Sequence, residues 1–197
     1  MKEQWDTMRR INLLTYNIIA ICGEAGSGKD TLARELVEAT GWNNIVSCTT
    51  RPPREGEIDG KNYYFLSNED FALKILNRDM LEATIFNDWC YGTMISSLDA
   101  NNINVGVFNP AGIEALKEDP RIKLFVYYLD VPAKTRIIRQ LNREENPDID
   151  EIIRRYKADK EDFSDLDFGE YTPIIYLSNN TAADLPLNVA AIKARFS

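Results

Sequence analysis

A glycine-rich segment with one lysine is the stretch whose residue types and spacing most clearly predict chemistry. Its glycines allow backbone conformations closed to other residues, so that consecutive N–H groups can point at a single anion. Lys29 would add a mobile ammonium group for the β- and γ-phosphates of a nucleotide. The segment therefore predicts a phosphate-binding loop. Its candidate contacts are Gly23, Glu24, Ala25, Gly26, Ser27, Gly28, Lys29, Asp30 and Thr31.

The residues on either side of this loop predict the elements that hold it. Residues 18–22 form a short, continuous apolar run, which is typical of a buried strand in a parallel sheet. Residues 32–37 carry apolar side chains at helical spacing. A helix that begins at the loop would also direct the positive end of its dipole at the anion. Strand, loop and helix together favour phosphate binding over the alternative, an ordinary glycine-rich turn.

The position after the lysine departs from the usual pattern. A serine or threonine normally stands there as a magnesium ligand, whereas this chain has Asp30 and places the hydroxyl one residue later, at Thr31. Asp30 could hold magnesium through water, or it could cap the helix. Asp30 and Thr31 are therefore the candidate metal ligands.

The composition indicates a soluble globular protein with one large domain. The chain has 197 residues, of which 44% are hydrophobic and 27% are charged. No apolar run approaches the ~18 residues that a membrane helix needs, and the mixed, charged N-terminus is unlike a secretory signal. The three widely spaced cysteines are more typical of reduced thiols than of a disulfide framework. We therefore expect a cytoplasmic protein with no membrane partner.

The absence of histidine and the acidic balance narrow the possible functions. A chain without histidine cannot use Ser-His-Asp or Cys-His nucleophilic catalysis. A net charge of −8 argues against a nucleic-acid backbone as partner. A phosphate substrate must then be bound by arginines that cluster locally.

Such a cluster follows the first helix. Arg51 and Arg54 flank a rigid pair of prolines, and guanidinium groups suit phosphate oxygens in bidentate geometry. Tyr63 could add a hydroxyl donor from a following strand. The alternative is a solvated surface loop with scattered charges.

Residues 47–63 resemble the nucleotide-monophosphate-binding segment of guanylate kinases. The pattern of that family is Ser-x-Thr-Thr-Arg-x-Pro-Arg-x-Gly-Glu-x-x-Gly-x-x-Tyr, and this chain has every fixed position of it. The resemblance implies that Arg51, Arg54 and Tyr63 bind the phosphate of the acceptor nucleotide. It also implies that Ser47 lies near the guanine edge.

The resemblance continues beyond this segment, with one departure. It implies that Glu82 accepts the N1 and N2 protons of guanine and that Tyr91, Gly92 and Thr93 form a neighbouring contact segment. Without the resemblance, Glu82 would be interpreted as a solvated helix residue. Guanylate kinases usually carry Asp-x-Asp farther along, where this chain has Val107 and Asn109, which weakens the case for strict guanine recognition. Asn109 can still donate and accept hydrogen bonds.

The second half resembles the lid of the same family. The resemblance implies that Arg139, Arg143 and Arg155 are catalytic arginines, with Arg154 as the alternative to Arg155. A salt-bridged pair of surface helices is the other interpretation for at least one of them. Asn179, which follows the last apolar strand, would lie near the base of ATP.

Five strand signals alternate with helices, which predicts an α/β fold with a five-stranded parallel sheet. The resemblance implies the three-layer P-loop fold of nucleoside monophosphate kinases in one domain, residues 1–197. The core would comprise residues 16–47, 98–137 and 161–197, with an acceptor-binding insertion at 48–97 and a lid at about 138–160. A short amphipathic helix in residues 1–15 is possible, from the spacing of Trp5, Met8 and Ile11.

The function implied is ATP-dependent phosphorylation of a nucleoside monophosphate, with GMP or dGMP as the expected acceptor and Mg²⁺ as cofactor. One alternative is a kinase for a broader set of deoxynucleoside monophosphates, because the Ser-Gly-Lys-Asp-Thr form of the loop resembles virus-encoded members of that group. Another is an inactive guanylate-kinase-like module that binds phosphopeptides, although such modules usually have a degraded phosphate loop. The sequence leaves the oligomeric state open.

Overall fold

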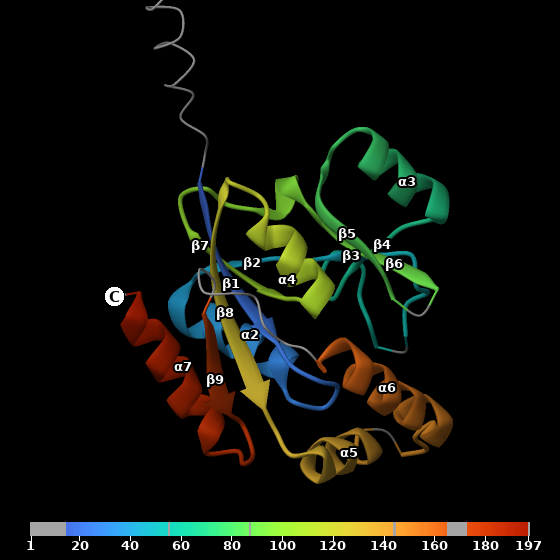
Figure 1. The fold of residues 1–197 in the computed structure, drawn as a ribbon, viewed down its shortest axis with the longest axis vertical. Helices are drawn as coiled ribbons and strands as arrows, with labels where there is room; N and C mark the ends of the chain where they lie inside the picture. The colour runs from blue at the N-terminus through green and yellow to red at the C-terminus, as the bar shows by residue number, and fades with distance from the viewer. Residues whose placement is uncertain (1–14, 55, 87, 144, 165–172, 197) are drawn as a thin grey trace, which may run out of the picture.

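The core of the molecule is a five-stranded sheet in which every strand pair is parallel (Figure 1). The computed structural model describes residues 15–54, 56–86, 88–143, 145–164 and 173–196. The possible helix around Trp5, Met8 and Ile11 lies outside these residues. The strand order is β2-β7-β1-β8-β9. The strands are β1 (Tyr16–Cys22), β2 (Asn43–Asn44), β7 (Ile103–Val107), β8 (Ile122–Asp130) and β9 (Ile174–Ser178).

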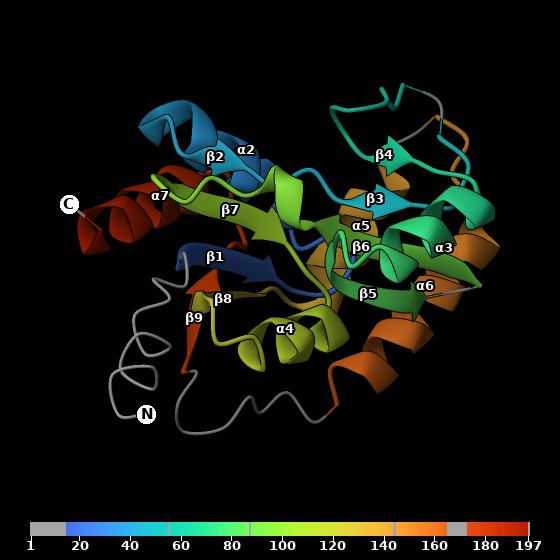
Figure 2. The same cartoon turned by 90° about the horizontal axis from the view of Figure 1, so that it is seen from above.

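The central strand β1 is buried on both faces because its apolar residues alternate between two cores. Ile18 and Ala20 pack on one side, together with residues of α4 (Pro110–Lys117). Ile19 and Ile21 pack on the other side, against apolar residues of α2 (Lys29–Thr40) and α7 (Asp184–Arg195). Figure 2 shows this arrangement, with α2 and α7 over one face of the sheet and α4 over the other. The predicted three-layer α/β fold with a five-stranded parallel sheet is confirmed.

A smaller mixed sheet stands beside the core, in the order β4-β3-β6-β5. Its longest pair is the antiparallel hairpin of β5 and β6, and the adjoining helix α3 is capped by Ser67, whose Oγ accepts a hydrogen bond from the Asp70 N–H at 3.0 Å. A single 3₁₀ turn, η1 (Ile95–Ser97), leads back to the core. The elements are β3 (Cys48–Thr49), β4 (Tyr64–Phe65), α3 (Asn68–Leu76), β5 (Met80–Phe86) and β6 (Trp89–Met94).

The apolar residues Ile45 and Val46 favour a strand, but β2 comprises only the two residues before them, Asn43–Asn44. The Ile45 N–H still donates to the Val105 carbonyl of β7. The Ser47 carbonyl, in contrast, accepts from Tyr64, which belongs to the smaller sheet. Residues 45–47 thus connect the two sheets. Because the chain turns toward the smaller sheet here, it does not pair further with β7.

Two further helices follow β8, namely α5 (Ala133–Leu141) and α6 (Ile149–Asp162). Asp148 caps α6 by accepting a hydrogen bond from the Glu151 N–H at 3.0 Å. Figure 1 shows both helices at the end of the sheet to which the β1–α2 loop belongs. Within the described residues, every helix is too short or too polar to span a membrane.

Candidate active site

The glycine-rich loop joins the end of β1 to the start of α2, as the sequence predicts. Gly26 and Gly28 have φ angles of 80° and 93°, which side chains rarely adopt. A Cβ atom at Gly26 would lie 2.5 Å from the Arg136 carbonyl oxygen, and one at Gly28 would lie 2.6 Å from Nδ2 of Asn179. Both positions therefore require glycine for the loop to pack against the residues around it.

The start of α2 decides one of the alternatives for Asp30. Gly28 is the N-cap residue of the helix, and no side chain makes a capping bond there. Asp30 lies in the first turn and is exposed, so the capping interpretation is wrong. Lys29 is on the same turn, and its Nζ lies 3.5 Å from the Glu24 carbonyl oxygen, across the loop.

Asp30 and Thr31 still fit the requirements of magnesium. They offer a carboxylate and a hydroxyl oxygen, and Mg²⁺ commonly binds through one or two carboxylates, water and substrate phosphates. In the described part of the chain, no group of three or more cysteine, aspartate or glutamate side chains could hold a metal on its own. A magnesium site here would therefore depend on nucleotide phosphates.

Arg139 and Asn179 meet at the Gly28 end of the loop. Nη2 of Arg139 donates to the Asn179 carbonyl at 2.8 Å, and Nη1 donates to the Ser27 carbonyl at 3.3 Å. The Asn179 Nδ2 donates to the same Ser27 oxygen at 2.7 Å. The fold thus brings together two predicted site residues from different elements. Arg143 is exposed beyond the end of α5, and within the described residues its side chain makes no hydrogen bond or ion pair.

Arg51 is held in a buried cluster on the smaller sheet. Its side chain is 9% exposed, and Nη2 donates to both carboxylate oxygens of Glu57, at 2.9 and 3.0 Å. The guanidinium lies 5.6 Å from the centre of the Tyr63 ring, which contacts the Tyr91 ring edge-on. Glu57 is a fixed position of the sequence pattern, but no role was predicted for it. Its role could have been predicted from the sequence, because a buried arginine needs an acidic partner and Glu57 lies close to Arg51 in the chain.

Tyr63 links this cluster to the phosphate loop. Burial raises the pKa of Tyr63 to about 12, and the nearby charge of Asp30 acts in the same direction. The phenol therefore stays protonated at neutral pH and can donate a hydrogen bond. Asp30 belongs to the first turn of α2, so the charge that acts on Tyr63 comes from the helix that follows the phosphate loop.

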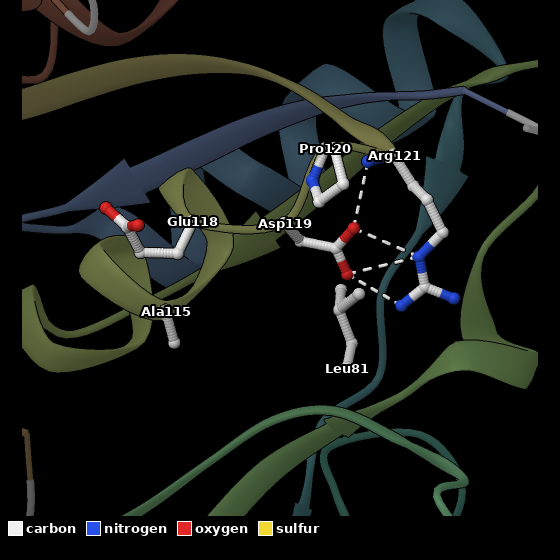
Figure 3. Close-up of a pocket in the computed structure, with 6 residues that line it drawn as sticks. All are labelled: Leu81, Ala115, Glu118, Asp119, Pro120 and Arg121. Atoms are coloured by element: carbon white, nitrogen blue, oxygen red, sulfur yellow. Dashed lines mark hydrogen bonds and ion pairs between the residues drawn. The ribbon is translucent and has the colours of Figure 1, made fainter.

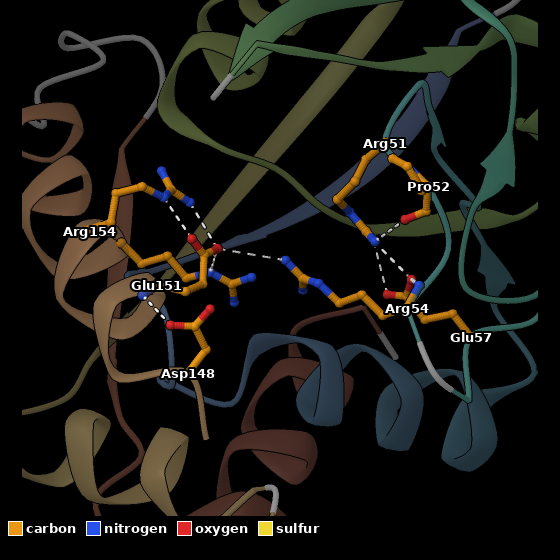
Figure 4. Close-up of polar contacts among 8 residues, drawn as sticks. Arg51, Pro52, Arg54, Glu57, Asp148, Glu151 and Arg154 are labelled. Atoms are coloured by element: carbon orange, nitrogen blue, oxygen red, sulfur yellow. Dashed lines mark hydrogen bonds and ion pairs between the residues drawn. The ribbon is translucent and has the colours of Figure 1, made fainter. Parts of the chain in front are cut away.

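The carboxylate of Glu151 contacts arginines from two separate segments of the chain (Figure 4). Its carboxylate accepts hydrogen bonds from Nε of Arg154 and Nε of Arg155, both at 2.7 Å. Nη2 of Arg54 lies 4.0 Å from the same carboxylate. Arg54 comes from the segment before β4, whereas the other arginines belong to α6. The salt bridges within α6 agree with the alternative interpretation of these arginines as a salt-bridged helix. The same carboxylate also lies near Arg54, so predicted site arginines from two segments meet at Glu151.

Glu82 lies on β5, opposite Thr93 of β6, and is 8% exposed. The interpretation as a solvated helix residue is therefore wrong. Burial raises the pKa of Glu82 to about 7. A Cβ atom at Gly92 would lie 2.8 Å from the Glu82 carbonyl oxygen, so glycine permits the close approach of the two strands there.

Asn109 and Ser47 also lie beside the smaller sheet. Asn109 caps α4, because its Oδ1 accepts a hydrogen bond from the Gly112 N–H at 2.8 Å. A Cβ atom at Gly112 would lie 3.1 Å from this oxygen and 3.6 Å from Oε2 of Glu82. The side chains of Asn109 and Glu82 are therefore both next to Gly112. Ser47 directly precedes β3 and is partly exposed.

A separate surface pocket lies at the turn between α4 and β8 (Figure 3). Its most prominent feature is an ion pair between Asp119 and Arg121, whose closest atoms are 2.6 Å apart. None of the predicted site residues lines it, and the two charged groups satisfy one another. We therefore place the candidate site at the phosphate loop and not in this pocket.

Comparison with known proteins identifies the family of this chain. The family model described as guanylate kinase matches residues 15–183. The chain belongs to the guanylate kinase family. The resemblance inferred from residues 47–63 is thereby confirmed.

Individual guanylate kinases show how close the relationship is. The guanylate kinase of Clostridium tetani is 35% identical over 149 residues, which cover 72% of this chain and 69% of the relative. That of Caldanaerobacter subterraneus subsp. tengcongensis is 31% identical over 162 residues, 80% of this chain and 78% of the relative. The crystal structure of guanylate kinase from Anaplasma phagocytophilum aligns with a TM-score of 0.65 at 20% identity, covering 92% of this chain and 85% of that one, and supports the fold.

Proposed function

We propose that this protein transfers the γ-phosphoryl group of ATP to GMP or dGMP, giving ADP and GDP or dGDP. One arrangement supports the proposal: the residues predicted to bind the phosphates of ATP lie near the residues predicted to bind the phosphate of the acceptor. Lys29 and the loop amides form one group, and Arg51, Arg54 and Tyr63 form the other. The effect of Asp30 on Tyr63 and the contact between Arg54 and Glu151 support their proximity.

The donor nucleotide would bind at the phosphate loop. The loop amides and the N-terminal end of α2 provide a positive environment for its phosphates. Lys29 would move from the Glu24 carbonyl to the β- and γ-phosphates. Asn179 borders the loop, and the base of ATP would lie near it. Asp30 and Thr31 would hold Mg²⁺, which supplies charge neutralisation when bound.

The acceptor would bind against the smaller sheet. Arg51 and Arg54 would hold its phosphate, and the protonated hydroxyl of Tyr63 would donate to it. An ionised Glu82 can accept hydrogen bonds from the two adjacent N–H donors of guanine. Because the Asn109 oxygen is used in capping α4, its amide nitrogen remains the group that can donate to the base.

The chain needs no general base for this reaction. The attacking oxygen belongs to a phosphate that is already ionised, and catalysis of phosphoryl transfer depends mainly on positioning and charge stabilisation. Arg155, Arg139 and Arg143 would spread positive charge over the transferring group. Closure of α5 and α6 over the site would keep water from intercepting the phosphoryl group.

A coupled assay of ADP release tests this function directly. It would be run with GMP, dGMP, dAMP, dTMP and dCMP as acceptors, and with Lys29→Met as the inactive control. We expect fast turnover with GMP and dGMP, and a loss of about a hundredfold or more in kcat for Lys29→Met with an unchanged circular dichroism spectrum. Comparable rates with the pyrimidine nucleotides would favour the broader kinase. No turnover with any acceptor would refute the proposal.

A further inference from the structure

Asp159 is a buried carboxylate on α6 to which the proposed reaction gives no role. The residue is 8% exposed, and aspartate is rarely buried to this extent unless it is paired. Burial raises its pKa, whereas the Ala25 N–H and the charges of Lys29, Arg136 and Arg154 act in the opposite direction. Its surroundings therefore offset part of the cost of burying the charge.

The contacts of Asp159 join three separate elements. Its Oδ2 accepts a hydrogen bond from the Ala25 N–H of the phosphate loop at 2.6 Å. The same oxygen lies 4.0 Å from Nη1 of Arg136, a residue of α5 that is 4% exposed. Nη2 of Arg136 in turn lies 2.7 Å from Oε1 of Glu24, again in the loop. Loop, α5 and α6 thus share one buried charge cluster, which comprises Glu24, Arg136 and Asp159.

The guanidinium of Arg136 makes one more contact with α6. It lies 5.9 Å from the centre of the Tyr156 ring, three residues before Asp159. Residues three and four apart share one face of a helix. The face of α6 that carries Asp159 is therefore packed against the loop and α5 at more than one point.

This face also carries the predicted catalytic arginine. Arg155 precedes Asp159 by four residues, which is one helical turn or about 6 Å along the axis. Glu151, which accepts from Nε of Arg155 at 2.7 Å, is one further turn back. An anchor at Asp159 consequently limits how far the α6 backbone at Arg155 can move from the phosphate loop.

We propose that Asp159 is a positioning residue: by joining α6 to the Ala25 amide and to Arg136, it holds Arg155 in register with the phosphate loop for phosphoryl transfer. The proposal rests on the proposed kinase activity. The new element is that Asp159, a carboxylate that would contact neither nucleotide, positions Arg155 for the reaction. The Glu24–Arg136 pair gives the anchor its fixed position.

A double-mutant cycle tests the proposal, with kcat and the KM values of GMP and ATP measured for each variant. The variants are Asp159→Ala, Arg155→Ala and the double variant. Asp159→Asn keeps an oxygen that can accept from Ala25 but removes the charge facing Arg136. Glu161→Ala, at an exposed position two residues farther along α6, is the matched control. Thermal unfolding of each variant shows whether it is folded at the assay temperature.

We expect Asp159→Ala to lower kcat about tenfold or more, while the KM of GMP changes less than about twofold. Asp159→Asn should retain more activity than Asp159→Ala, and Glu161→Ala should match the wild type. In the Arg155→Ala background, Asp159→Ala should have little further effect. Additive effects of the two substitutions, or wild-type kcat in folded Asp159→Ala, would overturn the proposal. An inactive wild-type protein would instead refute the kinase function itself.

Discussion

At the scale of single residues, burial determines the protonation of Glu82. Its pKa of about 7 lies above the ordinary value of 4.5, so the folded protein binds more protons than the unfolded chain between these two pH values. The free energy of unfolding should therefore decrease as pH rises through this window, by up to about 3 kcal/mol, and level off above pH 7. In Glu82→Gln this contribution should be absent, which denaturant unfolding at several pH values would measure.

The same ionisation should control guanine recognition. Only the ionised carboxylate accepts both donors of the base, so kcat/KM for GMP should rise about tenfold per pH unit below pH 7 and reach a plateau above it. Glu82→Gln should lower the plateau and remove this part of the rise. Any rise that persists in the variant belongs to another group, such as the phosphate of GMP. An unchanged profile in Glu82→Gln would contradict the role assigned to Glu82.

Arg51 tests the acceptor site in a different way. Arg51→Ala removes a buried guanidinium and leaves Glu57 without its bidentate partner. We expect the KM of GMP to rise, or kcat/KM for GMP to fall, by about a hundredfold, while the KM of ATP stays near the wild-type value. Lys61→Ala, an exposed position of the same segment, is the control and should have no effect. Kinetics altered only on the ATP side would count against this assignment.

At the scale of elements, long periodic segments could be predicted from the sequence and short ones could not. The apolar run of β1 is buried on both faces, and the residues of α2 repeat at helical spacing, so both elements could be placed. The two-residue strands β2, β3 and β4 are too short to carry a period of two. Glu82 resembles a solvated residue in isolation, because its burial comes from a strand and a helix that are distant in the sequence.

The ion pairs of the site also exceed what the sequence could specify. The arginines at positions 51, 54 and 155 could be assigned to phosphate binding by resemblance. The salt-bridged alternative included Glu151 among several acidic partners for the helix arginines, but Glu57 was not predicted as the partner of Arg51. Arg51 pairs with Glu57 of its own segment and Arg155 pairs with Glu151 one turn away on α6, whereas the contact of Arg54 with Glu151 depends on how that segment packs against α6. The resemblance predicted the arginines, whereas the structure shows which carboxylate pairs with each of them.

Glu151 yields a prediction about these elements. Its carboxylate occupies guanidinium groups that should bind phosphate, and its pairs are partly exposed, with side-chain exposures of 33% for Glu151 and 43% for Arg54. Exposed pairs contribute about 0.2–1 kcal/mol, so Glu151→Ala should leave Tm nearly unchanged and lower the KM of GMP about two- to fivefold. Asp150→Ala, at the neighbouring exposed position, is the control. A higher KM of GMP in Glu151→Ala would show that the carboxylate instead organises the arginines productively.

At the scale of the whole molecule, several cations of an acidic protein belong to the segments where the two anionic substrates would meet. The net charge is −8, yet Lys29, Arg51, Arg54, Arg139 and Arg155 all belong to the loop, the smaller sheet and the two helices around one gap. Two nucleotides and their phosphates would bring several negative charges into this space. Cations placed beside the transferring group would stabilise this charge during phosphoryl transfer.

The most direct test of the account is a ³¹P NMR time course of the full chain with ATP, GMP and Mg²⁺. We predict that ADP and GDP appear in equal amounts, that inorganic phosphate does not accumulate, and that both products are lost in Lys29→Met. Release of inorganic phosphate without GDP, or ATP left unchanged in the presence of GMP, would contradict the claim that the two groups of anion-binding residues serve one transfer reaction.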